Sequence, residues 1–298
     1  ATYEMVQKEL EPFVEDMSKF DFVASKRNYD TNVKAGKFLI TQKMTSFDMI
    51  RAMRRNIPVK VAFNNQESLG KLAQRMASQL EPDSVALYVS FTNIPFLKEN
   101  GFTEENILAM FIPNTYEFYW NVNSNKLADK MAKEYKKFWN HERLAKAAAK
   151  NLTPIEVSVL ASIVHKETAK NDERATVAGV YLNRLKTGMP LQADPTIIFA
   201  IKKESGDFDQ IIKRVFHNDL RINSPYNTYV NVGLPPGPIA MPDISAIDAV
   251  LNAEKHDYIY FCASPDKPGY HSFAANYAQH QVNARKYAAW VNKLGINR

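Results

Sequence analysis

The clearest helix start in this sequence lies in LTPIEVSVLASIVHKETAK, residues 152–170. Thr153 is a favourable N-cap residue, Pro154 suits the first helical position, and Glu156 can complete a capping box. These residues stand directly before an apolar run, and together they predict a helix from Pro154 to about Ala169. This helix constrains the middle of the fold more than any other segment does.

The next segment, NDERATVAGVYLNRLKTG, predicts a second helix. Asn171 or Asp172 can cap its start, and Gly188 stands just beyond its end, followed by Pro190. Because the connection between the two helices is short, we expect them to form a hairpin. In an antiparallel hairpin the chain after Gly188 starts roughly 20 Å from the end of the first helix, so LQADPTIIFA approaches that end only by doubling back.

The N-terminal region predicts a small unit in which helices and strands alternate. Residues 5–19 are expected to form a helix, and VKAGKFLI (33–40) a short strand. Thr45 or Ser46 can cap the helix that follows, and IPVKVAFN (57–64) alternates like a second strand. The order is therefore helix, strand, helix, strand.

The rest of the chain adds further helices, one apolar strand and a long loop. Helices are expected over residues 66–80 and 275–294, and YIYFCA (258–263) indicates a buried strand. SPYNTYVNVGLPPGPIAMP (224–242) is rich in Pro, Gly and Asn and predicts a loop of functional length. The sequence as a whole predicts an α+β fold.

The length and composition fit about two domains of a globular protein. The chain has 298 residues, of which 45% are hydrophobic, enough for a sizeable core. Pro58 marks the predicted seam between an N-terminal subdomain (1–58) and a larger domain (59–298). Since Cys262 is the only cysteine, an internal disulfide is excluded.

No segment of the sequence has the roughly 18 uninterrupted apolar residues of a membrane span, and ATYEMVQKEL does not resemble a signal peptide. The sequence leaves open whether an anchor helix precedes Ala1. The net charge is +6, and residues 126–150 hold eight Lys/Arg against three Asp/Glu. Apolar residues recur there at helical spacing, so the lysines are expected to form the wet side of an amphipathic helix and not a nucleic-acid site.

Three ionisable residues in a row, His165, Lys166 and Glu167, end the predicted helix at residues 154–169. Glu167 shares a face with large apolar residues one turn earlier, whereas Lys166 can reach water. Burial and the negative end of the helix dipole should both raise the pKa of Glu167, which suits a proton donor. The alternative is a buried glutamate paired with an arginine such as Arg174 or Arg184.

Metal and nucleotide chemistry find little support in the sequence. The pattern His165-x-Glu167 resembles a zinc deaminase signature, but that signature needs a pair of cysteines. His271 and His280 lack a metal-ligand spacing, and no glycine-rich phosphate loop or nucleophile elbow occurs. We therefore expect neither a metal nor a cofactor.

Several separated segments occur in the order typical of one enzyme family. They are PNTYEF (113–118), LASIVHKET (160–168), ER (173–174), VAGVYLNRL (177–185), GMPLQADPT (188–196), SPYNTY (224–229), GLPPGPI (233–239) and HSFA (271–274). With these segments the chain resembles the endolytic murein transglycosylases, the YceG-like family. The resemblance implies a LysM-like N-terminal subdomain followed by a mixed α/β catalytic domain.

The family's activity is internal cleavage of nascent peptidoglycan strands. The resemblance implies attack on the β-1,4 bond between N-acetylmuramic acid and N-acetylglucosamine, leaving a 1,6-anhydro end. It also implies a bacterial protein anchored in the cytoplasmic membrane by an N-terminal helix, with its body on the periplasmic side. Glycan strands and cell-wall synthesis proteins are the implied partners.

The resemblance places the catalytic role on Glu167. Many members carry a first glutamate where this chain has His165, so the role is expected to rest on one carboxyl group alone. One carboxyl suffices for a lytic transglycosylase, because the substrate's own 6-hydroxyl replaces water as the attacking group. The expected substrate contacts are Gln192, Asp194, Tyr226, Asn227, Thr228, Tyr229 and His271.

Two other functions stay open on the sequence. One is a conventional glycoside hydrolase that uses Asp194 or Glu173 as a second carboxylate. The other is a non-catalytic protein that binds or organises peptidoglycan through the N-terminal subdomain and the basic helix.

Overall fold

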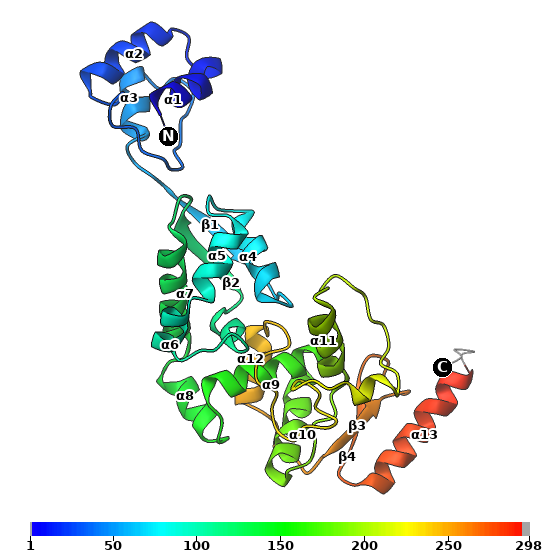
Figure 1. Cartoon of the computed structure of the whole chain (residues 1–298). Helices are drawn as coiled ribbons and strands as arrows, with labels where there is room; N and C mark the ends of the chain where they lie inside the picture. The colour runs from blue at the N-terminus through cyan, green and yellow to red at the C-terminus, as the bar shows by residue number, and fades with distance from the viewer. Residues whose placement is uncertain (1, 294–298) are drawn as a thin grey trace.

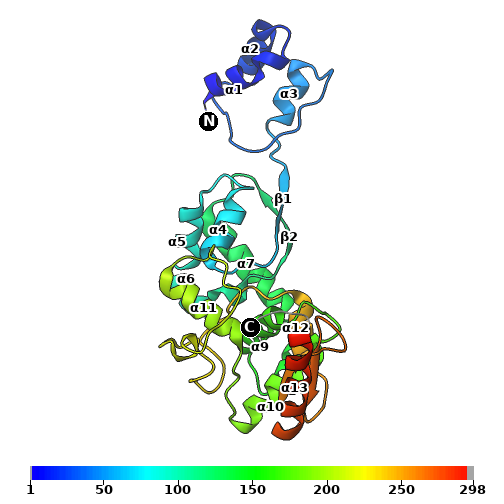
Figure 2. The same ribbon diagram turned by 90° about the vertical axis from the view of Figure 1, so that its right-hand side faces the viewer.

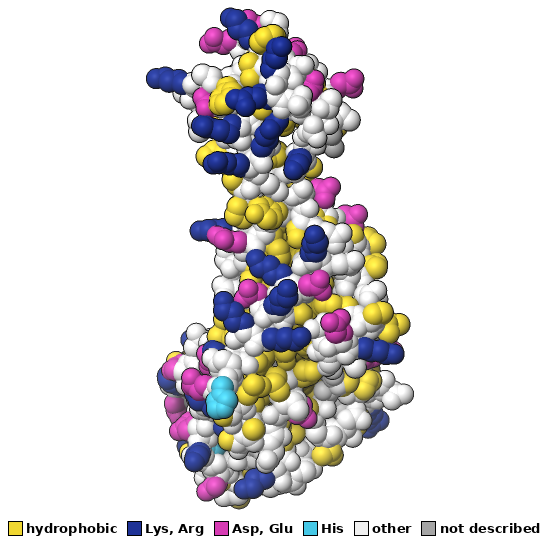
Figure 3. Space-filling view, turned by 90° about the vertical axis from the view of Figure 1, so that its left-hand side faces the viewer, with side chains coloured by type: hydrophobic (Ala, Val, Ile, Leu, Met, Phe, Trp, Pro, Cys, Tyr) yellow, Lys and Arg dark blue, Asp and Glu magenta, His cyan; other side chains and the backbone are white. Residues whose placement is uncertain are grey.

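The computed structural model describes residues 2–293 and has an elongated shape (Figures 1 and 2). The N-terminal helices form a small unit at one end, and a narrow waist joins this unit to the larger body (Figure 3). Buried apolar residues gather in three separate clusters, one in the N-terminal unit and two in the body. Helices predominate and the strands form two small sheets, so the α+β prediction is confirmed.

The N-terminal unit consists of short helices around a core of its own. They are α1 (Tyr3–Leu10), the 3-10 turn η1 (Glu11–Phe13), α2 (Met17–Lys26) and α3 (Ser46–Ala52). Phe20 and Ile50 are among its buried residues. The prediction of one continuous helix over residues 5–19 was wrong, because Pro12 interrupts it and Asp16 caps a new helix. Thr45 caps α3, as expected.

The strand predicted over residues 33–40 does not form. The backbone of this segment makes isolated hydrogen bonds and no strand ladder. Lys37 N donates to the Asn56 side chain, and the Lys37 carbonyl accepts from Ile57 N. Gly36 lies against Asn56 so closely that a Cβ atom would come within 2.7 Å of it. A loop held by Asn56, and by Asn121, whose side chain donates to the Ala35 carbonyl, therefore replaces the expected strand. The LysM-like assignment of this unit stays a prediction.

The second predicted strand of this region exists but pairs elsewhere. Strand β1 (Pro58–Phe63) is antiparallel to β2 (Asn114–Tyr119), with Pro58 opposite Tyr119 and Phe63 opposite Asn114. Val61 and Phe63 pack into the first cluster of the body, not into the core of the N-terminal unit. The change of core falls close to residue 58, where the domain boundary is predicted.

Helices cover the β1–β2 ribbon and form the upper part of the body in Figure 1. They are α4 (Leu69–Ala77), α5 (Ser84–Phe91), α6 (Ile94–Asn100), the 3-10 turn η2 (Ile107–Met110) and α7 (Ser124–Phe138). The basic segment forms α7 and α8 (His141–Ala148), two helices instead of one. In α7, Leu127 and Met131 are buried while Lys133 and Lys137 are exposed, which confirms the amphipathic interpretation.

The helical hairpin occupies the lower part of the body. Helix α9 (Pro154–Glu167) starts with the predicted capping box, and α10 (Arg174–Thr187) packs against it. Gly188 ends α10 with a positive φ of 67°, which glycine adopts without strain. The predicted cap at Asn171 or Asp172 was wrong: Glu173 stands at the N-cap and makes no capping bond.

The remaining elements complete the second body cluster. They are α11 (Asp194–Ser205), the 3-10 turn η3 (Asp219–Arg221), α12 (Ile244–Leu251), strands β3 (Tyr260–Ala263) and β4 (His271–Ala274), and α13 (Tyr277–Lys293). Strand β3 is half-buried and not buried as predicted, since its sheet has only β4 as a partner. Residue 294, the predicted end of the last helix, lies outside the described residues.

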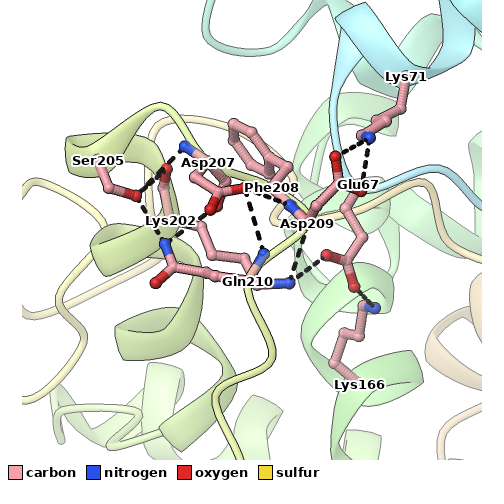
Figure 4. Close-up of polar contacts among 9 residues, drawn as sticks. All are labelled: Glu67, Lys71, Lys166, Lys202, Ser205, Asp207, Phe208, Asp209 and Gln210. Atoms are coloured by element: carbon pink, nitrogen blue, oxygen red, sulfur yellow. Dashed lines mark hydrogen bonds and ion pairs between the residues drawn. The ribbon is translucent and has the colours of Figure 1, made fainter.

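Ion pairs join the upper and lower parts of the body (Figure 4). Glu67, which precedes α4, accepts hydrogen bonds from Lys166 of α9 at 2.5 Å and Lys202 of α11 at 2.6 Å. Lys71 of α4 pairs with Asp209 in the loop after α11. Burial alone would raise the pKa of Glu67, but the two lysines outweigh it and lower this pKa. One carboxylate thus fixes α9 and α11 to the upper part.

Candidate active site

Glu167 is the last residue of α9 and lies at the turn towards α10. The apolar stripe predicted behind it is present, because Leu160, Ile163 and Val164 are fully buried. Glu167 itself is partly buried, and Tyr181 Oη donates a hydrogen bond to its Oε2 over 3.1 Å. The carboxyl group therefore stands at the edge of the core, with one oxygen held from α10.

The surroundings of Glu167 favour its protonated form. Burial raises the pKa of Glu167 to about 7 and is the largest effect on it. His271 and the hydrogen bond from Tyr181 act in the opposite direction. Smaller effects come from Asp194, which raises this pKa, and from Arg184, which lowers it. Near neutral pH the group is divided between acid and base forms, as acid–base catalysis requires.

The two arginines considered as ion-pair partners of Glu167 are engaged elsewhere. Arg174 forms an ion pair with Asp243 at 3.5 Å. Arg184 donates hydrogen bonds to backbone carbonyls, including that of Leu191 at 2.6 Å. Within the described part of the chain Glu167 has no ion pair, so the interpretation as a buried Glu–Arg pair was wrong.

The chain after α10 doubles back towards Glu167. It reverses at Gly188, and the hydrogen bond from Arg184 to the Leu191 carbonyl fixes the returning segment against α10. The backbone N–H of Ala193, the residue before Asp194, donates to Thr228 Oγ1 over 3.0 Å. As a result Asp194, at the start of α11, comes close enough to influence the Glu167 carboxyl electrostatically.

Of the seven predicted contact residues, Asp194, Tyr229 and His271 act on Glu167, and a fourth, Gln192, lies on the returning loop. Tyr229 donates a hydrogen bond to Asp194, and its pKa is raised by burial first, then by Asp194, and to a smaller extent by the charge of Glu167. His271, at the start of β4, is the strongest electrostatic influence on Glu167. The side chain of Gln192 is exposed on the returning loop, where its backbone has a positive φ of 49°.

The other three predicted contact residues are used inside the fold. Tyr226 is 1% exposed and packs its ring against Phe199, with centroids 4.6 Å apart. Asn227 is fully buried, and its Oδ1 accepts from the backbone N–H of Tyr229 over 2.9 Å. Thr228 holds the returning loop described above. These side chains shape the site and do not face solvent in this structure.

Sequence reasoning missed Tyr181 and considered Arg184 only as an ion-pair partner of Glu167, not as the residue that fixes the returning loop. Both stand in VAGVYLNRL three residues apart, a spacing that places them on one face of α10. An arginine on the same helical face as a tyrosine is a weak signal by itself. Both residues become part of the site because the chain returns to α10 after Gly188. No local sequence pattern predicts this return.

Of the remaining candidates, His165 contacts Asp243, with Nδ1 at 3.2 Å from the carboxylate, and burial lowers its pKa. Glu173, considered as a second carboxylate, is buried and bound to His271. Within residues 2–293 no group of three or more His, Cys, Asp or Glu side chains is placed to hold a metal ion. The GLPPGPI loop contributes to a cavity of about 940 Å³ beside the helical hairpin.

The fold and the site define an α+β protein whose central helical hairpin presents a partly buried glutamate with a raised pKa. The chain belongs to the YceG-like family, whose model matches residues 1–286. A solved structure of a YceG-like protein from Listeria monocytogenes is similar, with 26% sequence identity, a TM-score of 0.62 and coverage of 95% of both chains.

Curated relatives are named endolytic murein transglycosylases. The protein from Streptococcus pneumoniae serotype 2 (strain D39) is 29% identical over 298 residues, covering 90% of this chain and 53% of its own. The Bacillus subtilis (strain 168) protein is 40% identical over 134 residues, or 45% of this chain and 35% of its own. The chain thus spans about half the length of the first of these relatives. No described helix is long and apolar enough to cross a membrane.

Proposed function

We propose that this protein is a peptidoglycan lytic transglycosylase that cleaves glycan strands internally. The observation that carries the proposal is the Glu167 carboxyl, which has a pKa of about 7. It lies at the position where the resemblance expects the catalytic acid. The names of the relatives support the same activity.

In the proposed mechanism Glu167 acts twice. Protonated, it donates to the oxygen that links N-acetylmuramic acid to N-acetylglucosamine, while the bond from this oxygen to the anomeric carbon breaks. As a carboxylate, it then removes the proton of the muramic 6-hydroxyl, and that oxygen closes on the anomeric carbon. The proton given in the first step is regained in the second, and no water, metal or cofactor is consumed.

Polar groups around Glu167 would hold the sugar and share the positive charge of the transition state. Asp194 and Tyr229 are joined to one another and lie within electrostatic reach of Glu167. We expect these two, with His271 and the exposed Gln192, to contact the substrate directly. Tyr226, Asn227 and Thr228 would act by keeping Tyr229 and the returning loop in place.

The first prediction is that Glu167→Gln loses cleavage. The amide cannot donate or accept the catalytic proton, so the rate should fall by about 10²- to 10⁴-fold, the usual contribution of a general acid–base group. Mass spectrometry of digested peptidoglycan measures this loss, and glycan binding and thermal stability serve as controls. Undiminished cleavage by the folded variant would refute the assignment of Glu167.

A two-carboxylate glycoside hydrolase is the second candidate function, and the proximity of Asp194 to Glu167 favours it. The products separate the two enzymes. An anhydro end, lighter by one water, supports the transglycosylase, whereas a reducing end supports the hydrolase. A non-catalytic binding protein would yield neither product and would keep its function in Glu167→Gln.

We also propose a division of labour along the chain. The N-terminal subdomain (1–58), with its expected LysM-like character, would hold glycan, while residues 59–298 would carry the catalytic site. The relatives' names point to cell-wall peptidoglycan as the substrate, so the body would act outside the cytoplasmic membrane, anchored by a helix before Ala1 and working beside cell-wall synthesis proteins. Fractionation of cells that express the full-length protein tests the location.

A further inference from the structure

A buried carboxylate, Glu173, holds His271 at two points. Glu173 is 5% exposed, and its Oε1 accepts from the backbone N–H of His271 over 2.7 Å. Its Oε2 lies 2.9 Å from Nδ1 of the His271 ring and also accepts from Thr168 Oγ1 over 3.1 Å. The backbone and the imidazole of His271 are therefore both fixed by one side chain at the start of α10.

The contact with Glu173 determines the tautomer of His271. An ionised carboxylate only accepts hydrogen bonds, so Nδ1 of the imidazole has to carry a proton. Nε2 is then the ring nitrogen left for other partners. It offers a lone pair when the ring is neutral and an N–H when the ring is cationic.

The ring of Phe261 links His271 to Tyr181, the hydrogen-bond partner of Glu167. The ring of Phe261 lies 5.0 Å from the His271 ring and 5.8 Å from the Tyr181 ring, centroid to centroid. Tyr181 in turn donates its hydroxyl proton to Glu167. After burial, His271 has the largest effect on the pKa of Glu167 and lowers it.

We propose that Glu173 is a positioning residue, which fixes His271 so that Nε2 serves the proton-transfer chemistry of Glu167. A cationic ring would stabilise the Glu167 carboxylate after it has given up its proton. A neutral ring would accept a hydrogen bond from the protonated carboxyl or from a substrate hydroxyl. The inference rests on the proposed function of Glu167 as the acid–base group.

The other charged or titratable groups that act on Glu167 differ from His271 in one respect. They are Tyr181 and Arg184 of α10, Asp194 of α11 and Tyr229 of the loop after η3. Among the groups described that act on Glu167, His271 alone is an imidazole bound to a buried carboxylate of its own. Glu173 therefore acts on Glu167 through this imidazole.

The test is a titration of the Glu167 carboxyl in the whole folded protein by carbon-13 NMR, with the signal assigned by its absence in Glu167→Gln. In Glu173→Gln the carboxylate that fixes the His271 backbone and ring is gone. The Glu167 midpoint should then rise by about 1 pH unit, the size expected from losing a nearby opposite charge.

The matched control is Asp172→Asn. Asp172 is the neighbouring residue and joins the same two segments, because it accepts a hydrogen bond from Tyr270 Oη over 3.0 Å. A merely structural role for the link between α10 and β4 would give both variants the same effect. We expect the Glu167 midpoint of Asp172→Asn to equal that of wild type.

Either an unchanged midpoint in folded Glu173→Gln or an equal rise in Asp172→Asn overturns the inference. If Glu173→Gln does not fold, His271→Gln replaces it, and here too an unchanged midpoint overturns the inference. Cleavage is measured separately: wild type that cleaves no peptidoglycan would refute the proposed function, while the titration still decides the role of Glu173.

Discussion

Under the proposed function, Glu167 would serve catalysis at the expense of stability. In the unfolded chain its carboxyl ionises freely, with the ordinary glutamate pKa of 4.5, whereas in the folded protein burial raises the pKa to about 7. The folded state therefore binds a proton more tightly than the unfolded state does. By linkage, the free energy of unfolding has to fall as the pH rises between these two values.

The second prediction concerns this pH dependence. The contribution of Glu167 is fully present below pH 4.5 and is lost as the pH rises to about 7. Glu167→Gln lacks this loss, so its stability relative to wild type should increase across that window by up to about 3 kcal/mol. Urea unfolding of both proteins from pH 4 to 8 measures the difference. A constant difference over the whole range would contradict the raised pKa.

The third prediction concerns Tyr181, whose hydrogen bond lowers the pKa of Glu167. Without it, in Tyr181→Phe, this pKa should rise, and the alkaline limb of the pH profile of kcat/KM should move to higher pH. Tyr116→Phe is the control, because this buried tyrosine belongs to the other body cluster and donates to the Ile112 carbonyl. Equal profiles for Tyr181→Phe and wild type would show that the hydrogen bond has no part in setting the pKa.

Among the elements, those with strong local signals were predicted well. The capping box of Thr153 and Glu156 and the glycine at 188 gave the ends of α9 and α10 within two residues. The cap of α10 was not predictable, because Asp172 and Glu173 bind partners about a hundred residues away in sequence. Capping propensity describes the local chain only, and distant hydrogen-bond donors decide the outcome here.

Like the helices and strands, the candidate site was predictable only where the local signals are strong. Helical periodicity and the resemblance pointed to Glu167, and the structure brings Asp194, Tyr229 and His271 to it. The sequence does not show which side chains of SPYNTY point inwards, because buried and exposed positions do not alternate regularly in this segment. Asn227 and Tyr229 belong to the same loop, yet one is buried in backbone hydrogen bonds and the other lies beside Asp194.

The fourth prediction tests the close packing of the GLPPGPI loop. A Cβ atom on Gly237 would lie 1.8 Å from the Glu105 carbonyl oxygen, so Gly237→Ala has to displace backbone. We expect a loss of several degrees in Tm. Gly70→Ala is the control, because its Cβ would meet only Ser68 Oγ at 3.9 Å, and alanine favours helix α4. Similar melting curves for the two variants would contradict the close approach.

On the scale of the whole molecule, the three separate cores suggest more than one cooperative unit. Phe20 and Met53 lie in the cluster of the N-terminal unit, whereas Val61 already belongs to the body. Ion pairs of Glu67 fix the two parts of the body to one another, whereas the polar contacts described between the N-terminal unit and the body are two hydrogen bonds of Asn121, with Asn56 and with the Ala35 carbonyl. We therefore expect the N-terminal unit to open while the body stays folded.

The fifth prediction follows from this arrangement. Phe20→Ala should destabilise the N-terminal unit by about 3–5 kcal/mol, the usual cost of removing a buried phenylalanine ring. Hydrogen exchange followed by mass spectrometry should show faster exchange in residues 3–52 and unchanged exchange in α9 and α10. Faster exchange throughout the chain would mean that the molecule unfolds as one unit.

The pairing of β1 with β2 also has a mechanical consequence. Strand β1 leaves the N-terminal unit and runs directly into the body, where it pairs with β2 from Pro58 to Phe63 (Figure 1). A force that pulls the N-terminal unit away from the body would act along the axis of β1. It would load all the hydrogen bonds of the ribbon together, in shear, and would not open them one after another. Tension on one end of the protein would thus reach the body through six residue pairs that resist it jointly.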